Sequence, residues 1–301
     1  GSPMHRTALL FTLLALSGLL PAQRPVRLHI ESGGLRRTAR LFTPEGRGPW
    51  PLVLALHGGG GTGKGMEKLT HLDELGSREK FASCFPDGVG RSWNDGREDF
   101  HGHAAARGVD DMAFLSALVA RLVKDGTADP RRIYVCGMSN GGMMTLRLAC
   151  EMPGLFAAAG VVAASEPATR RCHGDAPLPI IFIHGSADPL MPLAGGEIKL
   201  FRKGRGRGTV ISVAESVGDW QARDHAPSGT RTELPVLDAS DPTRAVLEDH
   251  GPMLHYIEVS GAGHVWPGGP QYAPVFLIGA TSRNLDASRT LWEFFRPHAR
   301  P

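Results

Sequence analysis

Short apolar runs alternate with amphipathic stretches along most of the chain. Two runs at 26–30 and 35–43 are separated only by Ser32-Gly33-Gly34, which predicts an antiparallel hairpin. Further apolar runs predict strands at 52–56, 81–85, 132–136, 157–163, 179–184 and 255–259. Helical periodicity predicts helices at 68–80, 111–124, 140–151, 211–223 and 287–295, with Asp110 and Asp286 as N-caps.

This alternation is typical of an α/β fold, in which a mostly parallel sheet is covered by helices on both faces. The polar, proline-containing stretch 227–251 departs from the pattern, and we interpret it as an excursion over the top of the sheet. The sequence shows no internal repeat and no low-complexity linker. We therefore expect residues 23–301 to form one domain without a large cap.

The first residues have the composition of a targeting segment. Residues 1–3 precede Met4 and are interpreted as a cloning remnant. Met4-His5-Arg6 is basic, residues 8–20 are apolar but too short to span a bilayer comfortably, and Ala22 offers a small residue for cleavage. We expect residues 1–22 to be removed, and the mature protein to be secreted or periplasmic without a membrane anchor.

The net charge of +3 is too small to indicate nucleic-acid binding. The densest basic run, Arg202–Arg207, is interleaved with glycine and contains no aromatic residue. We interpret this run as a solvated loop, with contact to an anionic polymer or surface as the alternative.

Four cysteines allow disulfides if the protein is exported. Cys84 and Cys136 fall in predicted strands, and if strand 52–56 lies between them their separation is about 10 Å, beyond disulfide reach. Cys150 ends a predicted helix and Cys172 lies in a loop before the next strand. We predict a disulfide between Cys150 and Cys172.

The segment Gly137-Met138-Ser139-Asn140-Gly141 lies between a predicted strand and a predicted helix. A serine in a G-x-S-x-G turn of this kind is held on a sharp, strained bend, and the helix N-terminus points at its hydroxyl. The flanking glycines allow neighbouring segments to approach closely. Ser139 is therefore the candidate nucleophile.

A serine hydroxyl needs a base to accept its proton and an acid to orient that base. With such an elbow the acid and then the histidine follow along the chain, each in a loop after a strand. Asp188 follows strand 179–184, whereas its rivals Asp219, Asp238 and Asp241 follow no predicted strand. Of 13 histidines, His264 alone combines a late position, a strand end and flanking glycine.

The reaction also needs donors for the developing oxyanion. We expect the backbone N–H of Asn140, immediately after the nucleophile, to be one donor. The glycine-rich loop that follows strand 52–56 supplies the other, and we choose Gly59, with Gly58 or Gly60 as alternatives. We expect His57 to support this loop and His184 to be a structural turn residue.

Two other motifs suggest different chemistry. Residues 58–64 match most of a phosphate-binding loop, but Gly65 stands where a Ser or Thr would bind magnesium. His101 and His103 could suggest a metal, but two histidines in a Gly/Ala-rich stretch are more often loop residues. We expect no cofactor and no metal.

With these residues placed, the chain resembles the exported esterases of the polyhydroxybutyrate depolymerase and feruloyl esterase group. The resemblance spans nearly the whole mature chain, including a similar ending at 278–295. The matching motifs are Leu56–Gly60, Phe85–Gly88, Ser92–Asp95, Val109–Asp111, Gly137–Met144, His184–Asp188 and Gly263–Gly269.

The resemblance implies an α/β-hydrolase fold, a Ser139, Asp188, His264 triad and carboxylic ester substrates. We expect an exported, monomeric serine esterase that works through an acyl-enzyme. Its substrates could be hydroxyalkanoate oligomers, feruloyl or acetyl sugar esters, or aromatic polyester fragments. The alternatives are a peptidase of the same fold and a catalytically silent binding protein.

Two tryptophans lie beside the proposed site. Trp93 and Trp266 could contact substrate through stacking on an aromatic group or lining a groove. For Trp266 the alternative is packing that fixes the His264 loop. Trp220 and Trp292, at helical positions, are expected in the core.

Overall fold

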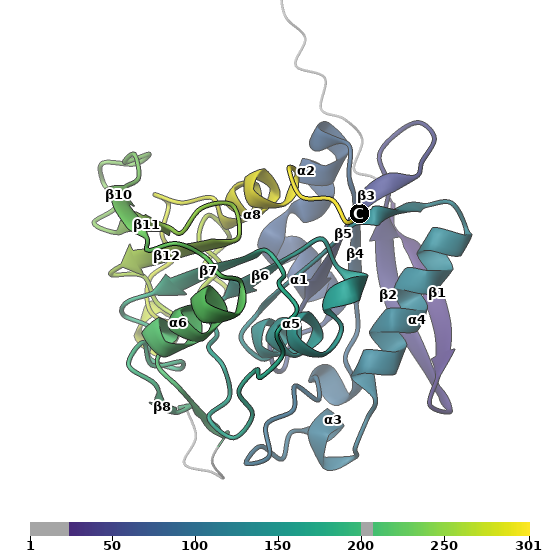
Figure 1. Ribbon diagram of the computed structural model, residues 1–301, viewed down its shortest axis with the longest axis horizontal. Coiled ribbons are helices and arrows are strands. Elements are labelled where there is room, and N and C mark those ends of the chain that lie inside the picture. Colours follow the sequence, from purple (N-terminus) through teal and green to yellow (C-terminus); the bar gives the residue numbers. More distant parts are fainter. Residues whose placement is uncertain (1–23, 200–206) are drawn as a thin grey trace, which may run out of the picture.

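A twisted ten-stranded sheet runs through the part of the chain that the computed structural model describes, residues 24–199 and 207–301 (Figure 1). Its strand order is β1-β2-β4-β3-β5-β6-β7-β12-β11-β10. The central strands pair in parallel, and antiparallel strands flank them on both sides. The strands are β1 (Val26–Ser32), β2 (Leu35–Phe42), β3 (Trp50–Leu56), β4 (Ala82–Pro86), β5 (Ala128–Met138), β6 (Ala158–Val162), β7 (Ile180–Gly185), β10 (Thr230–Glu233), β11 (Arg244–Asp249) and β12 (Leu254–Ser260).

Helices cover both faces of this sheet (Figure 1). Apolar side chains of α4 (Asp111–Lys124), α5 (Asn140–Glu151) and α6 (Val213–Arg223) belong to one core cluster. Those of α1 (Gly63–Thr70), α2 (Leu72–Glu79) and α8 (Ala287–Phe295) belong to the cluster on the opposite face. Burial of every residue in β4, β6 and β7 follows from this double cover, which is why these strands read as continuous apolar runs.

The helix ends mostly match the sequence predictions. Asp110 and Asp286 cap α4 and α8 by accepting from the third backbone N–H beyond them, at 2.9 and 3.0 Å. The helix predicted over 68–80 is instead two helices, α1 and α2. His71 adopts a left-handed conformation with φ 50° and breaks the run. The minor elements are η1 (Val89–Arg91), α3 (His103–Ala106), η2 (Pro153–Leu155), β8 (Gly196–Glu197), β9 (Thr209–Val210) and α7 (Val275–Ile278).

The stretch 227–251 does not lie over the top of the sheet, as the sequence suggested. It forms β10 and β11, which extend the sheet in antiparallel register beyond β12. Ala245 pairs with Val259 and is buried against the helices of that face, together with the partly buried Leu247. The stretch therefore supplies backbone partners for the edge of β12, which would otherwise be unpaired.

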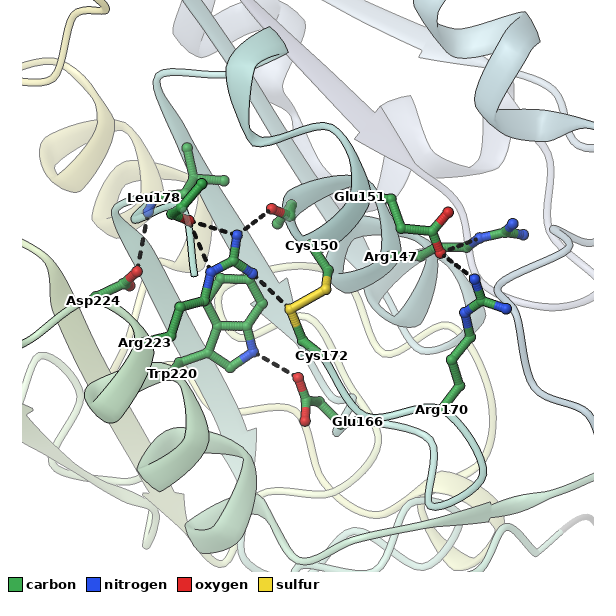
Figure 2. Close-up of a disulfide and its surroundings, with 12 residues drawn as sticks. Arg147, Cys150, Glu151, Glu166, Arg170, Cys172, Leu178, Trp220, Arg223 and Asp224 are labelled. Carbon is green, nitrogen blue, oxygen red and sulfur yellow. Dashed lines mark hydrogen bonds and ion pairs between the residues drawn. A yellow bond between two sulfur atoms is a disulfide. The ribbon is translucent and has the colours of Figure 1, made fainter. Parts of the chain in front are cut away.

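The cysteines lie as the sequence predicted. Cys84 and Cys136 are buried thiols on β4 and β5, with β3 between them. Cys150, at the end of α5, is bonded to Cys172, and their Cα atoms are 5.7 Å apart (Figure 2). Within residues 24–199 and 207–301, no helix is long and apolar enough to cross a membrane. The predicted signal peptide and most of the basic run, 202–206, lie outside the described residues.

Two side chains fasten the disulfide loop to α6 (Figure 2). The Arg223 guanidinium donates to Cys172 Sγ at 2.7 Å and to the carbonyl oxygen of Ala176 at 2.7 and 2.9 Å. Asp224 Oδ1 accepts from Leu178 N at 3.0 Å, just before β7 begins. Arg223 and Asp224 therefore hold the segment between Cys172 and the start of β7 against α6.

Replacing Cys150 and Cys172 together by serine is expected to lower the free energy of unfolding. The bond closes a 22-residue separation, and loss of that constraint on the unfolded chain costs about 3 kcal/mol. Urea denaturation, with and without reductant, measures the effect. Reductant should destabilise the wild type and leave the double variant unchanged. Equal midpoints for the two proteins without reductant would contradict the prediction.

Candidate active site

Ser139 lies at the turn where β5 ends and α5 begins. Its backbone has φ 57° and ψ −122°, a conformation that is costly for a residue with a side chain. The turn is held in place because Ser139 N donates to Val162 O of β6 at 3.0 Å. The strained turn predicted from the sequence is thus present, with the side chain at the N-terminus of α5.

Gly137 and Gly141, on either side of Ser139, are needed for steric reasons. A Cβ atom on Gly137 would overlap the carbonyl oxygen of Gly141, and one on Gly141 would overlap that of Leu56. Any side chain at these positions would push β5, α5 and β3 apart. The close approach therefore fixes where Ser139 stands relative to the loop after β3.

Asp188 and His264 meet at the same edge of the sheet. They follow β7 and β12, which are parallel neighbours with Gly185 paired to Val259. His264 Nδ1 lies 2.7 Å from Asp188 Oδ2, and Asp188's side chain is fully buried. This geometry fixes the imidazole tautomer with the proton on Nδ1, leaving Nε2 as an acceptor.

The surroundings of Asp188 favour its ionised form. Burial alone would raise the pKa of Asp188, but the charge of His264, the hydrogen bond to it and the backbone donors lower the pKa below its ordinary value. Those donors, Leu190 N and Met191 N, each lie 2.8 Å from Oδ1. A buried carboxylate so satisfied can orient an imidazole without taking its proton.

His184 is more than the turn residue that the sequence suggested. It lies near the end of β7, with Nε2 3.8 Å from Asp188 Oδ2 and hydrogen-bonded to Met191 O at 3.0 Å. Burial lowers the pKa of His184, which favours its neutral form. It supports the loop that carries Asp188.

A pocket of about 370 Å³ brings the remaining candidates together. Ser139, Asn140, His264 and Gly59 all line it. Most of its wall is apolar and includes Met66, Leu69, Met138, Met143, Leu190, Met191, Ile198 and Ile278. The residues predicted to form a nucleophile, a base and an oxyanion loop therefore face one cavity, with Asp188 behind His264.

His57 supports the glycine-rich loop, as predicted. Its Nε2 accepts from Gly88 N at 3.0 Å, which places the ring proton on Nδ1, 2.8 Å from Gly58 O. Burial lowers the pKa of His57. A neutral imidazole thus links the loop after β3 to the loop after β4.

The Asn140 side chain has a role that the sequence did not reveal. Its Oδ1 accepts from Trp93 N at 2.8 Å, and its Nδ2 donates to Trp93 O at 3.0 Å and to Asp95 Oδ2 at 2.6 Å. All three groups are buried. The network fixes the first residue of α5, whose backbone N–H is the expected oxyanion donor.

The predicted substrate contacts of Trp93 and Trp266 are wrong. The two side chains are buried, at 0% and 1% exposure, and neither lines the pocket. Trp93 Nε1 donates to His57 O at 2.8 Å, and Trp266 Nε1 donates to Ser288 Oγ at 3.0 Å. Both indoles pack the loops that carry the site, which is the alternative given for Trp266. Trp220 and Trp292 lie in the core, as expected.

Several pocket residues gave no recognisable signal in the sequence. Arg97, Lys199 and Tyr272 line the pocket, and the Tyr272 hydroxyl donates to His264 O at 2.7 Å. Arg207, the last residue of the basic run taken as a solvated loop, lines it too. Among residues 24–199 and 207–301, no three metal-ligating side chains gather into a site.

Comparison with known proteins agrees with this geometry. The profile of the esterase PHB depolymerase family matches residues 40–170. The putative esterase NocK of Nocardia uniformis subsp. tsuyamanensis is 34% identical over 287 residues, which cover 90% of this chain and 78% of that protein. The chain belongs to the esterase PHB depolymerase family.

Two further proteins share a lower sequence identity with this esterase PHB depolymerase family member. The poly(3-hydroxybutyrate) depolymerase of Ralstonia pickettii is 27% identical over 75% of this chain, which spans half of that protein's length. The acetyl xylan esterase from Aspergillus awamori shares the fold, with a TM-score of 0.55 and 19% identity over 76% of this chain and 89% of its own. The fold is that of the α/β-hydrolases, and the protein is a carboxylic ester hydrolase.

Another cavity, of about 310 Å³, lies beside the disulfide (Figure 2). Its wall includes Glu166, which is 1% exposed. Glu166 Oε1 accepts from Trp220 Nε1 at 2.9 Å, but Oε2 finds no hydrogen-bond partner among the described residues. Burial, with a smaller effect of Asp219, raises the pKa of Glu166 to about 7.

The raised pKa of Glu166 predicts a pH-dependent stability. Between its ordinary pKa of 4.5 and about 7, the folded protein keeps a proton that the unfolded chain has lost, so stability falls as pH rises through this window. Wild type should lose on the order of 3 kcal/mol relative to Glu166→Gln.

Urea denaturation of both proteins at pH 4.5 and pH 8 measures the difference. Glu151→Gln, at a more exposed glutamate of the same cavity, is the matched control. A difference between wild type and Glu166→Gln that does not change with pH would contradict the prediction, because it would show that the pKa of Glu166 is the same in the folded and unfolded protein.

Proposed function

We propose that this esterase is a serine hydrolase with Ser139 as nucleophile, His264 as base and Asp188 as orienting acid. One observation carries the proposal. A strained serine at a helix N-terminus shares a pocket with a histidine that is hydrogen-bonded, at 2.7 Å, to a buried carboxylate. Three chemically complementary groups from three separate loops are the arrangement that nucleophilic ester cleavage needs.

In this mechanism His264 Nε2 accepts the proton of Ser139 Oγ as the oxygen attacks the ester carbonyl. The imidazolium then protonates the departing alcohol, which leaves an acyl group on Ser139. Water, deprotonated by the same imidazole, releases the acid. Asp188 stays ionised, because its pKa is lowered, and stabilises the imidazolium in both steps.

We assign the oxyanion donors to the backbone N–H groups of Asn140 and Gly59. Both residues line the pocket beside Ser139. The alternative Gly60 is less suited as a donor, because its N–H already donates to Arg91 O at 2.7 Å. Each oxyanion donor typically contributes about 3 to 4 kcal/mol to transition-state stabilisation.

The pocket's size and apolar wall support a small or oligomeric carboxylic ester over a bulky one. Hydroxyalkanoate oligomers, feruloyl or acetyl sugar esters and aromatic polyester fragments are the candidates. We also propose that residues 23–301 act as a single catalytic domain. Export of that domain is supported by the Cys150–Cys172 disulfide, since such bonds persist mainly in oxidising compartments.

Ser139→Ala should abolish nearly all hydrolysis of 4-nitrophenyl butyrate, lowering kcat at least about 10³-fold because no nucleophile remains. Ser228→Ala, at an exposed serine of a surface loop, is the matched control and should keep full activity. Circular dichroism melts of both variants establish that they fold. Equal activity of Ser139→Ala and wild type would exclude Ser139 as the nucleophile.

Asp188→Asn should lower kcat by about 10⁴, because an amide cannot hold the imidazole in the required tautomer and charge state. Asp219→Asn provides the control. Asp219 was a rival in the sequence, but it pairs with Arg171 at the surface and should be dispensable. Steady-state kinetics on the same ester distinguishes the two. A larger loss in the Asp219 variant would contradict the assignment.

A further inference from the structure

The charged residues that line the pocket beside Ser139, apart from the histidines, are all cations. They are Arg97, Lys199 and Arg207. In the described part of the chain no aspartate or glutamate lines this pocket. An ester that is neutral and wholly apolar would leave these positive charges without a function in binding.

Arg97 already has its counter-ion. Its guanidinium forms three hydrogen bonds to Asp95, at 2.7, 3.0 and 3.1 Å, and the two side chains are 2% and 0% exposed. It also stacks on Phe100, 3.8 Å from the ring centroid. The Asp95–Arg97 pair is therefore a buried structural ion pair that also fixes Asn140, and its charge is balanced.

Arg207 has no such partner. Among the described residues its side chain forms no ion pair, and residues 1–23 and 200–206 contain no Asp or Glu. Arg207 is an exposed residue, and partial burial of its guanidinium and the positive charge of nearby Arg97 both lower its pKa, with no carboxylate to offset them. An anion bound beside this guanidinium would relieve the repulsion.

Arg207 is also in the right place. Its Nη1 lies 4.0 Å from the position that a Cβ atom on Gly59 would occupy, so the guanidinium stands over the proposed oxyanion loop. Because Gly59 has no side chain, it does not separate the Arg207 guanidinium from the pocket. A group attached to an ester bound at Ser139 can therefore reach it.

The backbone around Arg207 is held firmly. The Arg97 guanidinium donates to Arg207 O, Ile198 N donates to Gly208 O at 2.9 Å, and Thr209 N donates to Asp99 Oδ2 at 2.8 Å. Lys199, which follows Ile198 on the facing segment, donates its N–H to Leu190 O at 3.0 Å. Lys199 and Arg207 thus lie on two facing segments, and each segment is hydrogen-bonded to a residue that lines the pocket.

We propose that the ester cleaved at this site carries a carboxylate, which Arg207 binds with help from Lys199, while its apolar part packs against the methionine and leucine wall. The proposal rests on the proposed function of Ser139. A guanidinium presents paired N–H donors that match a carboxylate in a bidentate geometry. Arg207 is then a specificity-determining residue.

This binding has a distinct kinetic signature. The carboxylate is remote from the reacting carbonyl, so its contact with Arg207 is the same in the ground state and in the transition state. Losing the contact should raise KM for an anionic ester and leave kcat nearly unchanged. A neutral ester of similar length should be unaffected.

Two matched pairs of substrates test the proposal. The mono-4-nitrophenyl ester of adipic acid and 4-nitrophenyl heptanoate differ in charge on the acyl side. On the alcohol side, 4-acetoxybenzoate and its methyl ester differ in the same way. Each pair is assayed with wild type, Arg207→Gln, Arg207→Lys and Arg36→Gln, the last being an exposed arginine on β2 that serves as control.

For at least one pair, Arg207→Gln should raise KM for the anionic ester about 10- to 100-fold, without a comparable change for its neutral partner. For Arg207→Lys, KM for the anionic ester should lie between those of wild type and Arg207→Gln. Arg36→Gln should behave as wild type. Added salt should raise KM for the anionic ester alone.

The proposal is overturned if wild type does not hydrolyse the anionic esters, or if Arg207→Gln changes neither anionic ester. It is also overturned if that variant affects charged and neutral esters equally, because a merely structural role would do so. Failure of the proposed function looks different. In that case Ser139→Ala would leave hydrolysis of the neutral esters intact, whatever Arg207 does.

Discussion

The site depends on the close approach of three backbone segments at one turn. Gly137 and Gly141 let β5, the start of α5 and the end of β3 come together, and Ser139 adopts its positive φ at this turn. Because the same contact brings the glycine-rich loop after β3 beside Ser139, a single steric constraint sets the positions of the proposed nucleophile and the proposed oxyanion loop. The strain is tolerated because β6 and the surrounding core hold the turn in place.

The rest of the site is built outward from that turn by buried polar contacts. Asn140 ties the helix start to Trp93 and Asp95, and His57 ties the glycine loop to Gly88. His184 and the backbone N–H groups near it hold Asp188 in place for His264. Each contact is of ordinary strength, but all are shielded from water, where losing one partner is costly. These contacts position the candidate residues around the pocket without a bound substrate.

Much of this arrangement could be predicted from the sequence because it follows from local chemistry. The predicted strands placed Asp188 and His264 at strand ends, and the predicted elements in which the four cysteines fall indicated the disulfide. What failed depended on packing between distant segments. Whether Trp93 and Trp266 face the pocket or the core, and whether 227–251 crosses the sheet or extends it, is decided by neighbours that the local pattern does not contain. The place of Arg207 at the pocket, although the residue is exposed, could not be predicted for the same reason.

The proposed mechanism requires Ser139 to be an activated nucleophile. Treatment with a fluorophosphonate, followed by digestion and mass spectrometry, tests it most directly, because such reagents bond covalently to an activated serine and leave ordinary hydroxyls unmodified. We expect one adduct per chain, on the peptide that contains Ser139, with parallel loss of esterase activity. Loss of activity with the adduct on another residue, or full activity with Ser139 modified, would contradict it.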